Sequence, residues 1–393
     1  MASLKENLQR AAPGLVLGAA FVAALIWLPA GWAMVVGALF ALVGVVRLRR
    51  PLLRNGALAL ASLLLAMAAV ELAFWMLAPN APNVGASKQE TPPDWYPQDP
   101  DLGFKPRPNT TIAATASYDG KPLYNVTYHI DAKGGRAVPG SVDRGPTWLF
   151  VGDSYMFSEG VEDSDTLPSM FARRLDPPAH VVNTGVPGYG STNIVRAFEL
   201  GTYDKQVIGK VAAVIAWATP PLLIRVTGDA SWMNTSPRYD FGSDGKLHWS
   251  GSFGTYRWTH PWAGASYYAR SNVGWIRRAT EEYMEREQTK LYIALMARLA
   301  ELARERYDAP LILLSNGPEK EPADQPDLQY LPAFDGLRAL GIPIVSVRKK
   351  LGPVRDWQQY FIPHDGHPTP KMNALVTDAL IETLATLKDK KAQ

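Results

Sequence analysis

The fold is decided by the stretch Trp148-Leu149-Phe150-Val151-Gly152-Asp153-Ser154-Tyr155. Apolar strand-forming residues run directly into a glycine turn, and a helical pattern follows at Leu167–Leu175. A buried strand that ends in such a turn places its first polar side chains at the carboxyl edge of a sheet, where open α/β sheets bind ligands. Ser154 is therefore a candidate nucleophile, although Gly-Asp-Ser alone also fits an ordinary strand-to-helix turn with an Asp or Ser cap.

The alternation of strand and helix patterns continues along the rest of the chain. Apolar runs typical of strands covered on both faces recur at His180–Asn183, Val211–Ala218, Leu311–Ser315 and Ile342–Val347. Helical patterns separate or follow them at Thr192–Thr202, Thr280–Arg306 and Thr369–Leu387. This alternation predicts an α/β fold, with a parallel sheet covered by helices on both sides.

The first 78 residues differ from everything after them and are predicted to form a membrane region. Residues 13–46 are almost wholly apolar, which is too long for one span of about 20 residues. We expect two spans, 13–29 and 31–47, that turn at Pro29–Gly31, with one long tilted helix as the alternative. A third span is predicted at 56–78. Glu71 near its end either pairs with a partner or a polar headgroup, or lies in water at the interface.

Charge bias gives the expected orientation of these spans. Lys5 and Arg10 precede the first pair of spans, and Arg47, Arg49, Arg50 and Arg54 follow it. Both ends of the pair are therefore expected in the cytoplasm, and the third span delivers the rest of the chain to the far side. The sequence predicts a multi-pass bacterial inner-membrane protein with a periplasmic domain, and the lipid bilayer as a partner.

The segment after the membrane region reads as a Pro-rich linker over residues 79–108. Trp95, Tyr96, Leu102 and Phe104 are apolar anchors that allow it to pack on the domain. We expect the extracytoplasmic domain to span 109–393, with a β appendage at 109–146 that includes an Asp119-Gly120 turn.

An insertion at 226–280 interrupts the alternation of strands and helices. It holds a predicted hairpin around Asp244-Gly245. Its aromatic residues include Trp232, Trp249, Tyr256, Trp258 and Trp262. The insertion is expected to cover the active site and stack against sugars, to pack on the membrane surface, or to be a surface excursion with a small core of its own.

Composition excludes several functions. The net charge of +3 gives no indication of a nucleic-acid partner, and the chain has 0 cysteines, which removes disulfides, thiolate metal sites and a cysteine nucleophile. His364 and His367 flank Asp365, but no third metal ligand is evident. We expect no metal and no cofactor.

Three blocks of residues carry the predicted chemistry. The first is Gly152-Asp153-Ser154, and the second is Asn183-Thr184-Gly185-Val186-Pro187-Gly188-Tyr189-Gly190, where backbone N–H groups can approach a reacting oxygen. The third, His364-Asp365-Gly366-His367-Pro368, precedes the last helix and offers a base with an orienting carboxylate.

In this order and spacing the blocks resemble the SGNH/GDSL hydrolase superfamily over about residues 147–387. The resemblance implies a three-layer, flavodoxin-like parallel sheet. It implies that Ser154 is the nucleophile and that the N–H groups of Ser154 and Gly188 are oxyanion donors. It further implies that His367 is the general base and that Asp365 orients it, although in the family the acid lies three residues before the histidine, whereas here it lies two before.

The departure from the family lies after the third strand. The family normally ends that strand with Gly-x-Asn-Asp, whose Asn donates to the oxyanion, but this chain has Ala218-Thr219-Pro220-Pro221 and lacks the Asn. Thr219 and Arg225 are the possible replacement donors.

These observations predict a membrane-anchored esterase or O-acyltransferase that forms an acyl-enzyme on Ser154. Its substrate would be an acyl ester, expected on a cell-envelope or exported glycan, and envelope polysaccharide machinery is a possible partner. The alternative is a non-catalytic binding or assembly protein of such a glycan pathway that has kept the fold.

Overall fold

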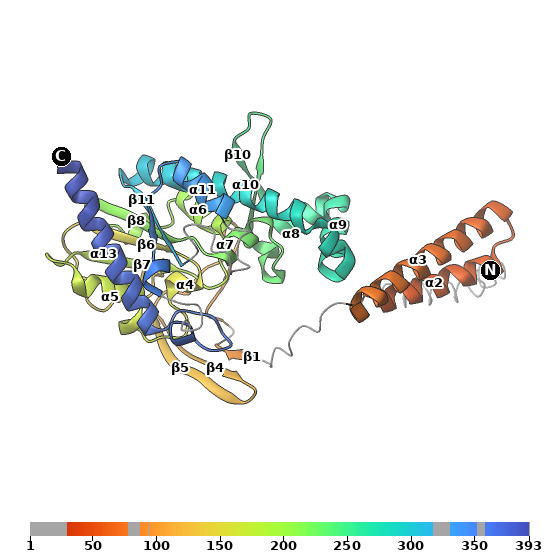
Figure 1. Cartoon of the computed structure of the whole chain (residues 1–393), viewed down its shortest axis with the longest axis horizontal. Helices are drawn as coiled ribbons and strands as arrows, with labels where there is room; N and C mark the ends of the chain where they lie inside the picture. Colours follow the sequence, from red (N-terminus) through yellow and green to blue (C-terminus); the bar gives the residue numbers. More distant parts are fainter. Residues whose placement is uncertain (1–29, 78–86, 93, 317–330, 352–357, 393) are drawn as a thin grey trace, which may run out of the picture. The chain divides into compact units, whose positions relative to one another are not determined.

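The computed structural model describes residues 30–77, 87–92, 94–316, 331–351 and 358–392. The chain divides into two compact units, one formed by residues 1–83 with 261–283 and the other by residues 84–260 with 284–393 (Figure 1). The sheet and all three sequence blocks belong to the second unit.

The first unit contains two apolar helices, α2 (Ala30–Arg47) and α3 (Pro51–Leu77), that pack against each other. Ala38 and Ala41 on α2 and Ala61 and Ala68 on α3 are buried, whereas leucines such as Leu63 are exposed. Buried small residues and exposed large apolar residues are typical of helices packed in lipid.

Of the described helices, α3 is the one long and apolar enough to cross a membrane, over Pro51–Ala73. The apolar part of α2, Trp32–Arg47, is shorter. The helix predicted at 56–78 begins at Pro51, because proline is well suited to the first helical position. The predicted span 13–29 lies outside the described residues.

The second unit is built around a five-stranded sheet whose strands are all parallel. The order is β7-β6-β8-β11-β12, and the strands are β6 (Thr147–Gly152), β7 (His180–Gly185), β8 (Val211–Trp217), β11 (Leu311–Ser315) and β12 (Ile344–Ser346). This is the flavodoxin-like order, which confirms the predicted fold class. The order reverses between β6 and β8, so the predicted ligand crevice opens at the carboxyl end of β6.

Helices cover both faces of the sheet (Figure 1). On one face α5 (Leu167–Arg174) packs against the final helix, α13 (Pro370–Ala392). On the other lie α6 (Ser191–Glu199), α10 (Gly274–Tyr307) and α11 (Leu331–Ala339). The sequence places Leu291, Leu295, Leu299 and Leu302 on one face of the long helix; the last three are buried and Leu291 is half-buried.

The β appendage is a three-stranded antiparallel sheet. Strands β4 (Thr110–Tyr118) and β5 (Lys121–Ile130) form the predicted hairpin at Asp119-Gly120. Strand β1 (Ser87–Glu90) pairs with β4 although it lies in the segment that the sequence indicates as linker. The anchors Trp95, Leu102 and Phe104 are buried, and β2 (Gln98–Asp99) pairs with β3 (Gly103–Phe104), so residues 87–92 and 94–108 are part of the folded unit.

The insertion begins with the short helices α7 (Pro220–Ile224), η3 (Arg225–Thr227) and η4 (Ser231–Thr235). The predicted hairpin follows as β9 (Pro237–Phe241) and β10 (Leu247–Ser252). Helices α8 (Phe253–Thr259) and α9 (Pro261–Asn272) lead into α10, which begins at Gly274, before the predicted start at Thr280.

Candidate active site

Ser154 is the first residue of the short helix α4 (Ser154–Phe157), directly after the glycine turn that ends β6. Asp153 caps this helix, and its Oδ1 accepts a hydrogen bond from the Tyr155 N–H at 3.0 Å. Ser154 is only 5% exposed. Among the described residues no acceptor takes the Ser154 N–H, so this donor remains free to bind a substrate oxygen.

The second block lies beside this helix because a glycine allows a close approach. A Cβ on Gly185 would lie 2.2 Å from the Phe157 nitrogen, so only glycine fits where β7 ends against α4. Gly188 has a φ of +85°, which other residues rarely adopt. Its carbonyl accepts a hydrogen bond from Trp232 Nε1 at 3.1 Å, and its N–H bonds to no other residue of the described chain.

His367 and Asp365 form a hydrogen-bonded pair in the loop before α13. Nδ1 of His367 lies 2.6 Å from Asp365 Oδ1, and the same oxygen accepts the His367 backbone N–H at 3.1 Å. Burial lowers the pKa of His367, but its hydrogen bond with Asp365 and the nearby carboxylates outweigh this effect. The pKa of His367 is therefore raised above its ordinary value of 6.5.

The three blocks meet in one cavity of about 520 Å³. Ser154, Gly188, Asp365 and His367 line it together with Arg225, Trp232, Glu159, Gln89 and the aromatic residues Tyr96 and Phe104. Ser154 and His367 share the cavity, but no hydrogen bond joins these two described side chains. Catalytic hydrogen bonds are often long before substrate binds.

Of the two candidate third donors, the structure places only Arg225 in this cavity. Its Nη1 donates to Asp153 Oδ2 at 3.1 Å and to the Tyr189 carbonyl at 2.8 Å. No hydrogen bond within the described chain uses its Nε or Nη2. Thr219 is 3% exposed and does not line the cavity, and its hydroxyl finds no partner in the described part of the chain.

Glu159 is a site residue that the sequence analysis missed. Its Oε2 lies 3.5 Å from His367 Nε2, on the side of the ring opposite Asp365, and its carboxyl also accepts a hydrogen bond from Gln89 of β1. Burial, with the charges of Asp365 and Asp153, raises the pKa of Glu159. The signal in the sequence was a carboxylate only five residues after Ser154, close enough that its N–H bonds to the Ser154 carbonyl at 3.0 Å.

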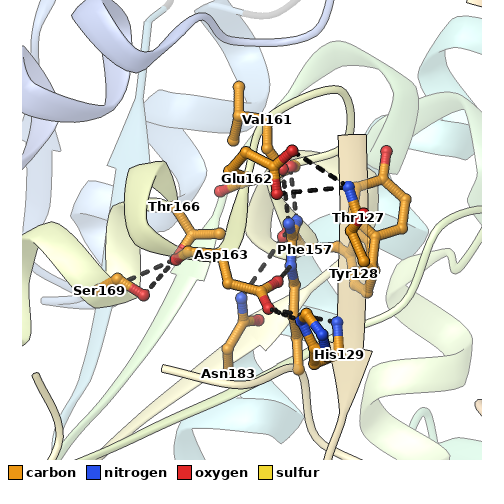
Figure 2. A network of polar contacts seen from close by, with 12 residues as sticks. Thr127, Tyr128, His129, Phe157, Val161, Glu162, Asp163, Thr166, Ser169 and Asn183 are labelled. Carbon is orange, nitrogen blue, oxygen red and sulfur yellow. Dashed lines mark hydrogen bonds and ion pairs between the residues drawn. The ribbon is translucent and has the colours of Figure 1, made fainter. Parts of the chain in front are cut away.

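The loop that carries Glu159 is fixed by the buried side chain of Arg136, which the sequence analysis also missed. The guanidinium donates to the carbonyl oxygens of Phe157 and Ser158 at 2.7 Å each and of Val161 at 2.6 Å. It also donates to Asp163 Oδ1 at 2.8 Å. Figure 2 shows this network, in which Asp163 also bonds to His129. Arg136 follows Lys133 and two glycines in a polar segment, and nothing in that local sequence predicts a buried position.

The contacts of His364 differ from those of His367, the proposed base. Its ring stacks on Tyr118 with centroids 3.7 Å apart, and it does not line the cavity. The described residues contain no cluster of three or more His, Cys, Asp or Glu side chains suited to a metal ion.

Comparison with known proteins gives structural similarities only. No protein-family model and no curated protein matches the chain. A solved structure of a member of the lipolytic protein G-D-S-L family from Veillonella parvula is 11% identical, with a TM-score of 0.37, and the match covers 61% of this chain and 97% of that one. A lipase/acylhydrolase from Enterococcus faecalis is 11% identical over 61% and 95% of the two chains, with a TM-score of 0.33.

A third similar structure is a psychrotrophic esterase from Pseudoalteromonas sp., 10% identical over 62% of this chain and 100% of that one, with a TM-score of 0.33. The solved structures similar to this chain thus include a member of the family that its motifs resemble. At these identities and TM-scores, the similarities do not assign an activity to this chain.

Proposed function

We propose that the protein is an acyl-ester hydrolase or O-acyltransferase that forms an acyl-enzyme on Ser154. One observation carries this proposal: Ser154, Gly188 and the His367–Asp365 pair, which lie far apart in the sequence, line the same cavity. A nucleophile, a base with its orienting carboxylate and two free N–H donors are the parts that acyl transfer needs.

Each group has a role in the proposed reaction. Ser154 Oγ attacks the carbonyl carbon of the ester while its proton passes to His367 Nε2, and Asp365 holds the imidazole in the tautomer that can accept it. The N–H groups of Ser154 and Gly188 stabilise the oxyanion. The intermediate then expels the alcohol, which takes the proton from His367, and leaves the acyl group on Ser154.

The second half-reaction decides between the two activities. If water attacks the acyl-enzyme, the protein is an esterase; if a sugar hydroxyl attacks, it is an O-acyltransferase. Trp232, which is 52% exposed, lines the cavity beside Gly188, and its indole face suits a sugar ring. This supports a glycan of the cell envelope or an exported glycan as the substrate.

A fluorophosphonate probe tests the nucleophile in the detergent-solubilised full chain. Labelling of the wild type and none of Ser154→Ala is the expected result. An unlabelled wild type, or equal labelling of the variant, would instead support the non-catalytic binding protein that remains the alternative. A soluble glycan acceptor tests the second half-reaction. If the protein is an O-acyltransferase, adding the acceptor should increase turnover of the acyl donor; if it is an esterase, turnover should stay the same.

We also propose that α3 anchors the protein in the bacterial inner membrane, with the catalytic unit in the periplasm. The apolar length of α3 and the arginines that precede it support this orientation. A reporter that is active only in the cytoplasm, fused after residue 80, is expected to give no signal. A bright fusion would contradict the orientation.

Arg225 is expected to be the third oxyanion donor. Arg225→Lys keeps a positive charge beside Asp153 but loses the free guanidinium N–H groups, and kcat should fall about 10²-fold. Thr219→Val is the matched control, since replacing a buried hydroxyl that has no partner should leave kcat and stability almost unchanged. A fall in kcat for Thr219→Val but not for Arg225→Lys would assign the donor to Thr219.

Glu159 is expected to shift the acid limb of the pH–rate profile by raising the pKa of His367. Because the base must be neutral to accept the proton, kcat/KM should rise with pH through the pKa of His367, above 6.5. Glu159→Gln removes a negative charge that stabilises the imidazolium, so the limb should move to lower pH by about one unit.

Glu162→Gln is the control for this prediction. It makes the same change three residues away on an exposed side chain, which accepts the Thr127 N–H and does not line the cavity. The acid limb of this variant should match the wild type. Equal shifts in both variants would show a general effect of charge and would remove the special role of Glu159.

A further inference from the structure

Helix α9 (Pro261–Asn272) lies at the protein surface. None of its residues is buried, although a surface helix normally buries one face against its own protein. Its sequence, Pro-Trp-Ala-Gly-Ala-Ser-Tyr-Tyr-Ala-Arg-Ser-Asn, contains no acidic residue. Trp262 is 88% exposed. Part of the helix, including Ala263, Gly264 and Tyr267, is half-buried, whereas the ring of Trp262 stands out from the protein surface.

A hydrogen bond ties the start of the next helix, α10, to α3, within the same compact unit. Both carboxylate oxygens of Glu71 accept the Gly274 N–H at 3.1 Å. Gly274 is the first residue of α10 and follows α9 by two residues. The carboxylate thus caps the N-terminus of α10. The partner of Glu71 is therefore a backbone N–H group of the predicted insertion.

The position of Glu71 shows where along α3 this contact lies. It lies two residues before Ala73, where the apolar stretch that begins at Pro51 ends. That stretch is about 34 Å long at about 1.5 Å per residue, slightly more than the roughly 30 Å hydrocarbon layer. If α3 spans a bilayer, Glu71 and Gly274 lie at the boundary between the acyl chains and the headgroups.

We propose that α9 lies in the interfacial layer of the lipid bilayer, with Trp262 among the headgroups and upper acyl chains. The inference rests on the proposed anchoring of the protein by α3. Tryptophan and tyrosine prefer this layer because their rings are apolar at one side and polar at the other. A segment with an exposed tryptophan and no acidic residue, two residues from a contact with α3 at headgroup level, suits lipid as the occupant.

The absence of cysteine from the chain allows a direct measurement of depth. Trp262→Cys, labelled with an environment-sensitive fluorophore, is reconstituted as the full chain in phosphatidylcholine nanodiscs. The lipids carry a spin label either near the headgroup or near the end of the acyl chain. Leu63→Cys, on an outward-facing position in the middle of α3, is the matched standard for a deep site.

The expected result is that the headgroup-proximal spin label quenches the fluorophore at position 262 more strongly than the deep one, and that position 63 shows the reverse order. Quenching at 63 without quenching at 262 would overturn this inference and leave the anchoring intact. Absence of quenching at both positions would overturn the anchoring as well. Fluorophosphonate labelling of the same samples reports separately on Ser154 and thus on the proposed chemistry.

Discussion

Replacing Ser154 with alanine is expected to lower kcat for an activated acyl ester by on the order of 10⁴-fold or more. The variant keeps Asp153 as the helix cap and keeps both oxyanion N–H groups, so it retains binding and loses the covalent step. No hydrogen bond to Ser154 Oγ exists among the described residues, and alanine is a good helix former, so the thermal midpoint should stay close to that of the wild type. Steady-state kinetics with thermal unfolding measures both quantities.

Ser158→Ala is the control for this substitution. It makes the same chemical change in the residue that follows α4, where Ser158 Oγ accepts the Leu167 N–H at 3.3 Å and does not line the cavity. This variant should lose some stability and keep its turnover. If Ser154→Ala retained the turnover of the wild type, Ser154 would not be the nucleophile.

Replacing His367 with alanine should be the second most damaging change. It removes the proposed base, and kcat should fall by on the order of 10⁴-fold. Asp365→Asn should cost a similar amount, because an amide in place of the carboxylate favours the wrong imidazole tautomer. The double variant should be little worse than either single variant, since both act in the same step.

His364→Asn serves as the control. His364 has a φ of +62°, a conformation that asparagine tolerates well, and its ring stacks on Tyr118 outside the cavity. Turnover should therefore be retained. A variant at position 364 that lost activity as fully as His367→Ala would contradict the assignment of the base.

The short spacing between Asp365 and His367 is compatible with this role for a local geometric reason. Asp365 Oδ1 accepts both the backbone N–H and the ring Nδ1 of the residue two positions later. A carboxylate that bonds the backbone two residues on is the arrangement of an Asx turn, which brings the acid beside the imidazole.

The central sheet was predictable because each strand carries its own signal. Runs such as Val211–Ala218 and Leu311–Ser315 are apolar throughout, as strands covered on both faces must be. Residues that follow parallel strands meet at one edge of the sheet, and Ser154 and Gly188 meet in this way.

The contacts that were not predictable depend on residues far apart in the sequence. Gln89 reaches Glu159 from a polar segment that has no apolar pattern, so its strand is formed by pairing with β4 rather than by its own composition. Arg136 lies outside the three sequence blocks. Its four hydrogen-bond acceptors are on residues 157–163, at least 21 positions later, and come close to it only when the loop after α4 is folded. Helix α10 begins earlier than its apolar pattern because a carboxylate on another helix caps it.

The formation of an acyl-enzyme on Ser154 is the central claim, and trapping it is the most direct test. The full chain is mixed with an excess of p-nitrophenyl acetate, quenched in acid and mapped by peptide mass spectrometry. We predict an initial burst of p-nitrophenol close to one per chain, with the acetyl group on the peptide that contains Ser154. Turnover without a burst, or an acetyl group on another residue while Ser154 stays unmodified, would contradict this account.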